Sequence, residues 1–187
     1  MANVNHSTLT DPYLHEPKGV ASAASGEVYI ANGSATGAWT QLQRHVGGHI
    51  AFSTLSPYAH SATTSDTPLD PSFSIVNNNG FSGVATPNAG LRYDGAETLH
   101  ASLTFTASIQ QASGTDRQVE MLFYLNGTAL EGSRVITTAS SGSWSQFTSA
   151  FNATLATNDV IEVHVKCDAI ATINFASAYL RIVGASA

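Results

Sequence analysis

The side chains in this chain that are most capable of chemistry are its histidines, its acidic residues and a single cysteine. His45 and His49 are four residues apart, which is the spacing of a zinc-binding pair on a helix. Glycines between them break the segment, and no third ligand follows, so we expect no metal site. His164 lies between a glutamate and a lysine on a predicted strand. We expect it at a polar outer position, where it could titrate near neutral pH.

Other patterns that could support catalysis are incomplete. Residues 80–83 (GFSG) have a superficial likeness to a nucleophile elbow, but the G-x-S-x-G spacing and a following helix are missing. Asp94 and Glu97 flank a Gly-Ala turn, where acidic residues are usually solvated. Cys167 is expected to be a small apolar filler at an inward-facing strand position. The sequence therefore predicts no catalytic residue, no metal and no cofactor, and it argues against an enzyme.

The composition points to a protein whose exterior is covered. Only 11% of the 187 residues are charged, whereas 43% are hydrophobic, and an average soluble domain has about 25% charged residues. The net charge of -6 and the scattered Lys and Arg residues argue against a nucleic-acid partner. No apolar run approaches the length of a membrane span, and the first residues lack a signal-peptide pattern, so no membrane partner is expected.

The periodicity of the apolar residues predicts an all-β protein. No segment has a convincing helical period, and residues 97–110 alternate strictly between apolar and polar side chains. Asn126-Gly127 closes one run with a strong hairpin signal, whereas residues 56–70 are expected to form a loop too polar to bury. Short strands separated by turns indicate a sandwich or barrel. The expected strands cover residues 49–55, 72–76, 81–84, 97–110, 118–125, 130–137, 144–155, 159–167 and 171–184.

The last expected strand, residues 171–184 (ATINFASAYLRIVG), changes the phase of its alternation near Ser177. A β-bulge explains the change, because one extra residue turns every later side chain to the other face. Tyr179 and Val183 then lie on the face opposite the core set, and they too need cover. We therefore expect this strand to lie mid-sheet, with its own core on one side and a second subunit on the other.

The amino-terminal part has a different character and suggests a boundary near residue 45. Residues 1–45 show little periodicity, with β-like runs at residues 27–31 and 39–42 separated by a turn-forming NGSATG. We expect an extended arm over residues 1–45 that becomes ordered on a partner, and a strand-rich domain over residues 46–187. The candidate contact residues of the arm are Tyr13, Leu14, His15, Pro17, Lys18 and Val20.

Residues 90–183 resemble the jelly roll of the tumour necrosis factor and complement globular-head type. The likeness lies in the order of a long alternating strand, FYLNGT, a GSW turn, LATNDVIEVHV and a closing INFASAYLRIVG. The resemblance implies a β-sandwich that assembles as a tight homotrimer. A cyclic interface would bury apolar side chains on the face opposite the core. The expected interface residues are Leu122, Tyr124, Tyr179, Arg181 and Val183.

The leader looks like the amino-terminal segment of tailed-bacteriophage virion proteins of the head-decoration, head-fibre and tail-fibre types. The pieces HEPKGVASA and VYIANGSATGAWT carry that likeness. It implies a structural virion protein: a homotrimeric decoration (cement) protein on the outer surface of a phage head, whose arm binds the major capsid protein. The alternative is a receptor-binding head or tail fibre protein that recognises a host surface glycan, although shaft repeats are missing.

Overall fold

The computed structural model describes residues 27–31, 37–41, 45–71, 73–84 and 90–186. The chain divides into two compact units, residues 1–43 and residues 44–187. In the first unit, β1 (Glu27–Ala31) pairs antiparallel with β2 (Gly37–Gln41). Tyr29 lies opposite Trp39 with ring centroids 5.5 Å apart, a cross-strand aromatic pair of the kind that stabilises a hairpin. The β-like runs expected in this part of the chain are thus confirmed as strands.

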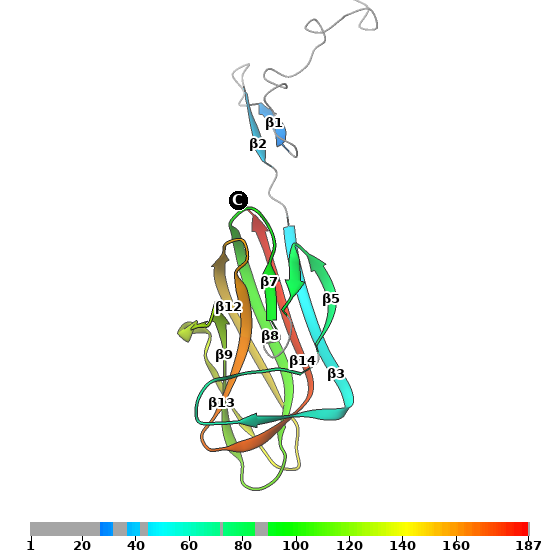
Figure 1. Ribbon diagram of the computed structural model, residues 1–187, viewed down its shortest axis with the longest axis vertical. Coiled ribbons are helices and arrows are strands. Elements are labelled where there is room, and N and C mark those ends of the chain that lie inside the picture. Colours follow the sequence, from blue (N-terminus) through cyan, green and yellow to red (C-terminus); the bar gives the residue numbers. More distant parts are fainter. Residues whose placement is uncertain (1–26, 32–36, 42–44, 72, 85–89, 187) are drawn as a thin grey trace, which may run out of the picture. The chain divides into compact units, whose positions relative to one another are not determined.

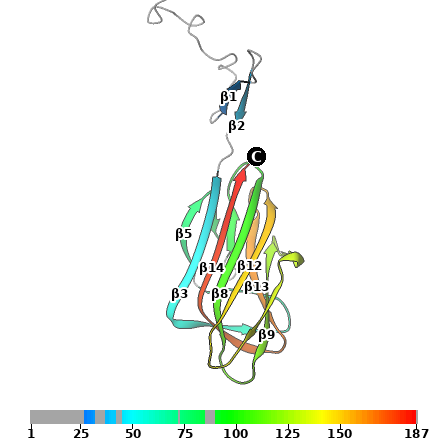
Figure 2. The ribbon, with the colours of Figure 1, turned by 180° about the vertical axis from the view of Figure 1, so that it is seen from behind.

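The second unit contains two sheets. The sheet that contains most of the long strands is called the β14 sheet. Its order is β12-β8-β14-β3-β5, with antiparallel pairing throughout, and Figure 2 shows these strands side by side. β14 lies in the middle, as the sequence predicted. The strands are β3 (His45–Ala62), β5 (Ser74–Asn79), β8 (Leu99–Gln111), β12 (Ser145–Leu155) and β14 (Ala171–Ser186).

The other sheet, which we call the β13 sheet, follows the order β10-β9-β13-β7-β6, with β11 also pairing with β9 and β4 with β13. A 3₁₀ turn, η3 (Glu131–Ser133), precedes β11. The strands are β4 (Thr67–Pro68), β6 (Phe81–Gly83), β7 (Gly90–Tyr93), β9 (Arg117–Leu125), β10 (Thr128–Ala129), β11 (Val135–Ala139) and β13 (Val160–Cys167).

The chain crosses repeatedly from one sheet to the other. β8 is followed by β9 in the opposite sheet, and β11, β12, β13 and β14 alternate between the sheets in turn (Figure 1). Two antiparallel sheets joined by such crossings form a jelly roll. The predicted all-β jelly-roll sandwich is therefore confirmed.

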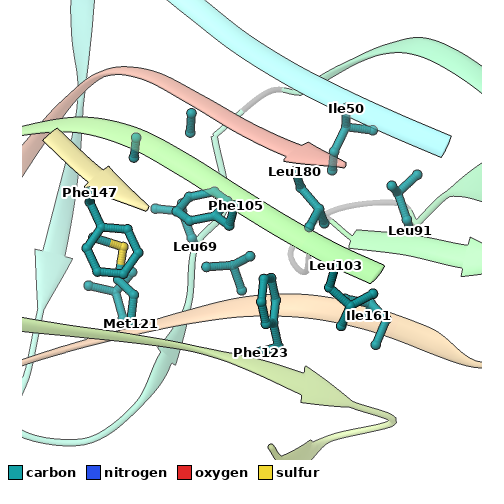
Figure 3. Close-up of a cluster of buried hydrophobic side chains, with 14 of the residues drawn as sticks. Ile50, Leu69, Leu91, Leu103, Phe105, Met121, Phe123, Phe147, Ile161 and Leu180 are labelled. Carbon is teal, nitrogen blue, oxygen red and sulfur yellow. The ribbon is translucent and has the colours of Figure 1, made fainter. Parts of the chain in front are cut away.

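Apolar side chains from both sheets meet between the layers. The odd-numbered residues of β8 from Leu99 to Ile109 point inward and are buried, as their alternation predicted. Phe105 and Phe147 come from neighbouring strands of one sheet, with ring centroids 6.1 Å apart, and Phe123 faces them from the other sheet (Figure 3). Fully burying such a side chain stabilises the fold by about 1.5–3 kcal/mol, so this layer holds the sandwich together.

The predicted bulge in β14 is confirmed. The register of β14 shifts between Phe175 and Ser177 against both of its neighbours, β3 and β8. Before the shift, Phe175 is fully buried, and after it, Leu180 is buried while Arg181 is exposed. One extra residue thus sets which side chains of the second half of β14 enter the core.

The turns follow their sequence signals. Asn126 and Gly127 have φ values of 50° and 76°, the left-handed pair of a type I′ hairpin turn. The Asn126 side chain also donates to Asp159 Oδ1 at 2.7 Å, which ties this turn to the start of β13. Gly80, with φ of 79°, makes the NNNG turn, and it passes the chain from β5 in one sheet to β6 in the other.

The expected polar loop over residues 56–70 is wrong. β3 continues to Ala62, and His60, Ala62 and Leu69 are only 6%, 0% and 1% exposed. The polar groups of this stretch find partners inside the fold, because His60 Nε2 lies 3.1 Å from Thr67 Oγ1, and Thr67 Oγ1 donates to the Val165 carbonyl at 3.0 Å. Paired polar groups can be buried at little cost, and composition alone does not show that pairing.

The expected single strand over residues 130–137 is also wrong in its first half. Ser133 Oγ donates to the Leu130 carbonyl at 2.7 Å and accepts a hydrogen bond from the Phe123 backbone N–H at 2.8 Å. A serine that bonds to nearby backbone in this way competes with the strand ladder. The chain therefore turns through η3 before β11 begins at Val135.

Candidate functional site

The outer face of the β14 sheet is almost free of charge. Among the strands of this sheet, one residue, Arg181, carries a formal charge, and none is an Asp, Glu or Lys. The strands of the β13 sheet, in contrast, include Arg92, Glu120, Glu162 and Lys166. A sheet surface with so few charges is unusual for a face in free contact with water.

The strand registers show which residues form this outer face. Tyr179 has Thr106 and Ala51 as its partners on either side, and Arg181 has Thr104 and His49. The next outward position is Val183, between Ser102 and Gly47. The surface is therefore built of small side chains, with Tyr179 as its main aromatic group. The outward residues on the edge strand β12 continue this pattern: Gln146, Thr148, Ala150, Asn152 and Thr154.

Two shallow hollows lie on this face. One, of about 600 Å³, is lined by residues of β12, β8, β14 and β3, including His100, Asn152 and Thr154. The other, of about 570 Å³, lies around Gly47 and is lined by His49, Arg181 and further residues of β3, β5 and β14. The outer face is thus nearly uncharged but not featureless.

The outer face of the β13 sheet carries a network of ion pairs instead. Arg134 Nη1 lies 2.6 Å from Glu120 Oε2, and its Nη2 lies 2.7 Å from Glu131 Oε2. Lys166 Nζ reaches the same Glu120 carboxylate at 3.0 Å. Burial acts to raise the pKa of Glu120, but the hydrogen bonds from Lys166 and Arg134 outweigh it and hold the pKa below its ordinary value. These charged side chains suit the outer face of the β13 sheet to contact with water.

Tyr124 and His164 extend that network. Their rings stack with centroids 3.7 Å apart, and Tyr124 Oη donates to Asp66 Oδ2 at 3.0 Å. Burial, together with the hydrogen bond to Asp66, raises the pKa of Tyr124. His164 Nε2 lies 3.1 Å from Glu162 Oε2. The predicted polar outer position of His164 is therefore confirmed, and Tyr124, on which its ring stacks, holds the segment around Asp66 against the sheet.

The expected trimer-interface residues do not share one surface. Tyr179, Arg181 and Val183 lie together on the outer face of the β14 sheet. Tyr124 lies on the β13 sheet, and Leu122 is 1% exposed within a single protomer. The grouping is corrected accordingly, because β9 and β14 belong to different sheets. A sequence pattern tells which residues share a strand face but not which sheet the strand joins.

The expected capsid-binding residues lie outside the part of the chain that the structure describes. They are Tyr13, Leu14, His15, Pro17, Lys18 and Val20. Their role remains a prediction.

The histidine and acidic side chains considered above as metal-binding or catalytic candidates do not form a cluster. His45 and His49 lie on one extended strand, so their Cα atoms are separated by about 13 Å along it. Asp94 accepts hydrogen bonds from Arg92 Nε at 2.8 Å and from Ser82 Oγ at 3.2 Å, which makes it a structural partner of a turn. In the described ranges, no group of three or more His, Cys, Asp or Glu side chains could hold a metal ion.

Cys167 is a buried free thiol at an inward position of β13, as the sequence predicted. Burial raises the pKa of its thiol, which lowers the reactivity of the group. Within the described residues, no helix is long and apolar enough to cross a membrane.

Comparisons with known proteins define the class of fold. No protein-family model and no curated protein sequence matches the chain. Among solved structures, Eiger TNF from S. frugiperda matches with a TM-score of 0.54 and 10% identity, over 75% of this chain and 92% of that one. The chain therefore has a jelly roll of the tumour necrosis factor type.

Two further structures are similar at lower scores. The PRD1 vertex protein P5 has a TM-score of 0.45 and 14% identity, over 75% of this chain and 96% of that one. Murine APRIL at pH 5.0 has a TM-score of 0.45 and 14% identity, over 75% of this chain and 99% of that one. At such identities the likeness concerns the fold alone.

Proposed function

We propose that the protein is a structural virion protein: a homotrimeric capsid decoration protein on the outer surface of a phage head. The observation that carries the proposal is the outer face of the β14 sheet around Tyr179 and Val183, on which Arg181 is the one residue with a formal charge. The resemblance of the leader to virion proteins supplies the setting. The tumour-necrosis-factor-type fold is compatible with the proposed assembly.

The contrast between the two outer faces supports self-association through the β14 sheet. Burying Ser, Thr and Ala side chains costs less desolvation than burying the ion pairs around Glu120, which would strip several charges of water. A closed ring in which each protomer presents the same face satisfies cyclic symmetry. The charged β13 sheet then faces outward and keeps the assembly soluble.

The proposed mechanism is mechanical. The arm over residues 1–45, with Tyr13, Leu14, Pro17 and Val20 as apolar contacts, would lie along subunits of the major capsid protein. Apolar area removed from water stabilises such contacts by about 25 cal/mol per Å². A protein that binds only the assembled shell shifts the shell toward its assembled state. Bridging of neighbouring subunits would then oppose the pressure of the packaged DNA.

The test compares the full-length protein with a variant that lacks residues 2–43. Both are mixed with heads that lack the decoration protein, and the bound fraction is measured by sedimentation and electron microscopy. We expect the full-length protein to bind heads, and the shortened protein to stay folded and trimeric but unbound. Binding of the shortened protein would place the anchor in residues 44–187. Full-length protein found only on tails would refute the head assignment.

A second function, receptor binding by a fibre protein, is favoured by one observation. Trp144 is 42% exposed and Ile170 is 77% exposed, in loops at the end of the sandwich opposite His45, where β3 begins. Exposed aromatic and aliphatic side chains on loops often contact ligands. Trp144→Ala should then reduce adsorption to host cells while head binding is unchanged. Equal adsorption of the wild type and Trp144→Ala to host cells would rule out this alternative.

A further inference from the structure

The hollow around Gly47 is a structural feature that neither the fold nor the proposed assembly requires. Gly47 lies between His45 and His49 on β3 and opposite Val183 on β14. A Cβ atom at Gly47 would lie 3.1 Å from the Ile182 carbonyl oxygen and 3.2 Å from Val183 Cγ1. The glycine thus allows close contact between the strands and leaves the floor of the hollow without a side chain.

The polar lining of the hollow consists of hydrogen-bond donors and contains no acid. Arg181 contributes a guanidinium group, His45 and His49 contribute imidazoles, and Asn79 contributes an amide. No Asp or Glu lines it, and within the described residues no ion pair involves Arg181. The permanent positive charge of Arg181 disfavours a metal ion in the hollow and attracts anions.

Two of these groups, the His49 imidazole and the Asn79 amide, contact neighbouring residues. The His49 ring packs against the Tyr179 ring with centroids 4.9 Å apart, and Asn79 Nδ2 donates to the His45 carbonyl at 3.2 Å. β14 and β5 pair with β3 on opposite sides, so groups from three strands converge on the hollow. A site on paired strands keeps its geometry better than a site on loops.

We propose that this hollow binds an oxyanion, namely a carboxylate, sulfate or phosphate group. The planar guanidinium of Arg181 matches the paired oxygens of such groups, and the imidazole of His49, the cross-strand partner of Arg181, supplies a further donor. The site is complete within one protomer, so it does not rest on the proposed trimer. If the outer face is an interface, the bound anion neutralises a guanidinium that would otherwise be buried unpaired.

The test is an NMR titration of the full-length protein with sodium sulfate, with sodium chloride adjusted to keep the ionic strength constant. We expect saturable shifts at the His49 and Arg181 signals. Arg181→Gln should weaken binding about tenfold, because a charge-assisted bidentate contact is lost. The control Arg92→Gln removes a cation, 48% exposed, from the other sheet and should leave binding unchanged. Shifts that do not saturate, or equal affinity in Arg181→Gln, would overturn the proposal.

Sedimentation in the same sulfate series distinguishes the source of the natural oxyanion. If a carboxylate from a second copy fills the hollow, sulfate competes with it and lowers the sedimenting mass of the wild type but not of Arg181→Gln. If the natural ligand is a free anion or an acidic sugar, the mass stays constant while the NMR shifts saturate. Saturable binding to a protein that sediments as a monomer would support this site and refute the proposed trimer.

Discussion

Placing a second positive charge near Arg181 on the nearly uncharged outer face tests the proposed assembly directly. Val183→Lys changes an outward side chain two residues after Arg181 and leaves the core residues Leu180 and Ile182 untouched, so each protomer should fold normally. In a trimer joined through this face, three ammonium groups would be buried without partners. At about 3 kcal/mol each, the total of roughly 9 kcal/mol raises the dissociation constant by about six powers of ten.

The assay is sedimentation velocity at micromolar protein, with circular dichroism to verify the strand content. The wild type should sediment at about three times its 19.5 kDa chain mass, and Val183→Lys at the mass of one chain. The matched control is Ile136→Lys, which changes a 55% exposed isoleucine on β11 in the opposite sheet and should remain trimeric. Unchanged association of Val183→Lys would show that this face is not the interface.

Three further predictions concern the folded protomer. Phe105→Ala removes a fully buried ring that packs on Phe147 and should lower the free energy of unfolding by about 3–5 kcal/mol in urea titrations. The pKa of Glu120 is lower in the folded protein, so its carboxylate stabilises the fold fully above the unfolded-state pKa of about 4.3. This contribution to stability is lost as the pH falls through the folded-state pKa. Between pH 5 and 3, the melting temperature of the wild type should therefore fall faster than that of Glu120→Gln. Gly184→Ala would place a Cβ close to the His100 carbonyl oxygen and the neighbouring strand, so it should lower the melting temperature sharply, whereas a melting temperature equal to the wild type would show that β8 and β14 can separate there.

The strands with strict alternation could be predicted from the sequence, because their periodicity records one buried face. β13 follows that pattern from end to end and β8 follows it except at Ser108, which is buried, and the bulge near Ser177 is visible as a change of phase. The buried end of β3 could not be predicted in this way, because the hydrogen bond that makes His60 compatible with burial comes from Thr67. Burial of polar residues depends on partners that a single segment does not reveal.

The outer faces were predicted less well than the core. The apolar character of Leu122 suggested an interface position, yet the fold of one protomer already covers it. The useful signal was the distribution of charge among the strands, since acidic residues occur on β9 and β13 and on none of the strands that join β14. This difference in charge can be recognised only when it is known which strands belong to which sheet. Pairing between strands that are distant in sequence determines this assignment, and local periodicity does not.

The register shift in β14 connects the core to the outer face. Opposite β8, Phe175 pairs with Ile109 and Ser177 pairs with Ser108, so β14 contains one residue more than its partner at this point. With regular alternation, the inward phase of Phe175 would continue to Arg181, and a guanidinium without an acidic partner would enter a layer of aromatic and aliphatic side chains. Burying such a charge costs several kcal/mol. The bulge places Leu180 in the core instead and leaves Arg181 beside His49. The same extra residue that completes the core thus creates both the proposed interface and the proposed oxyanion site.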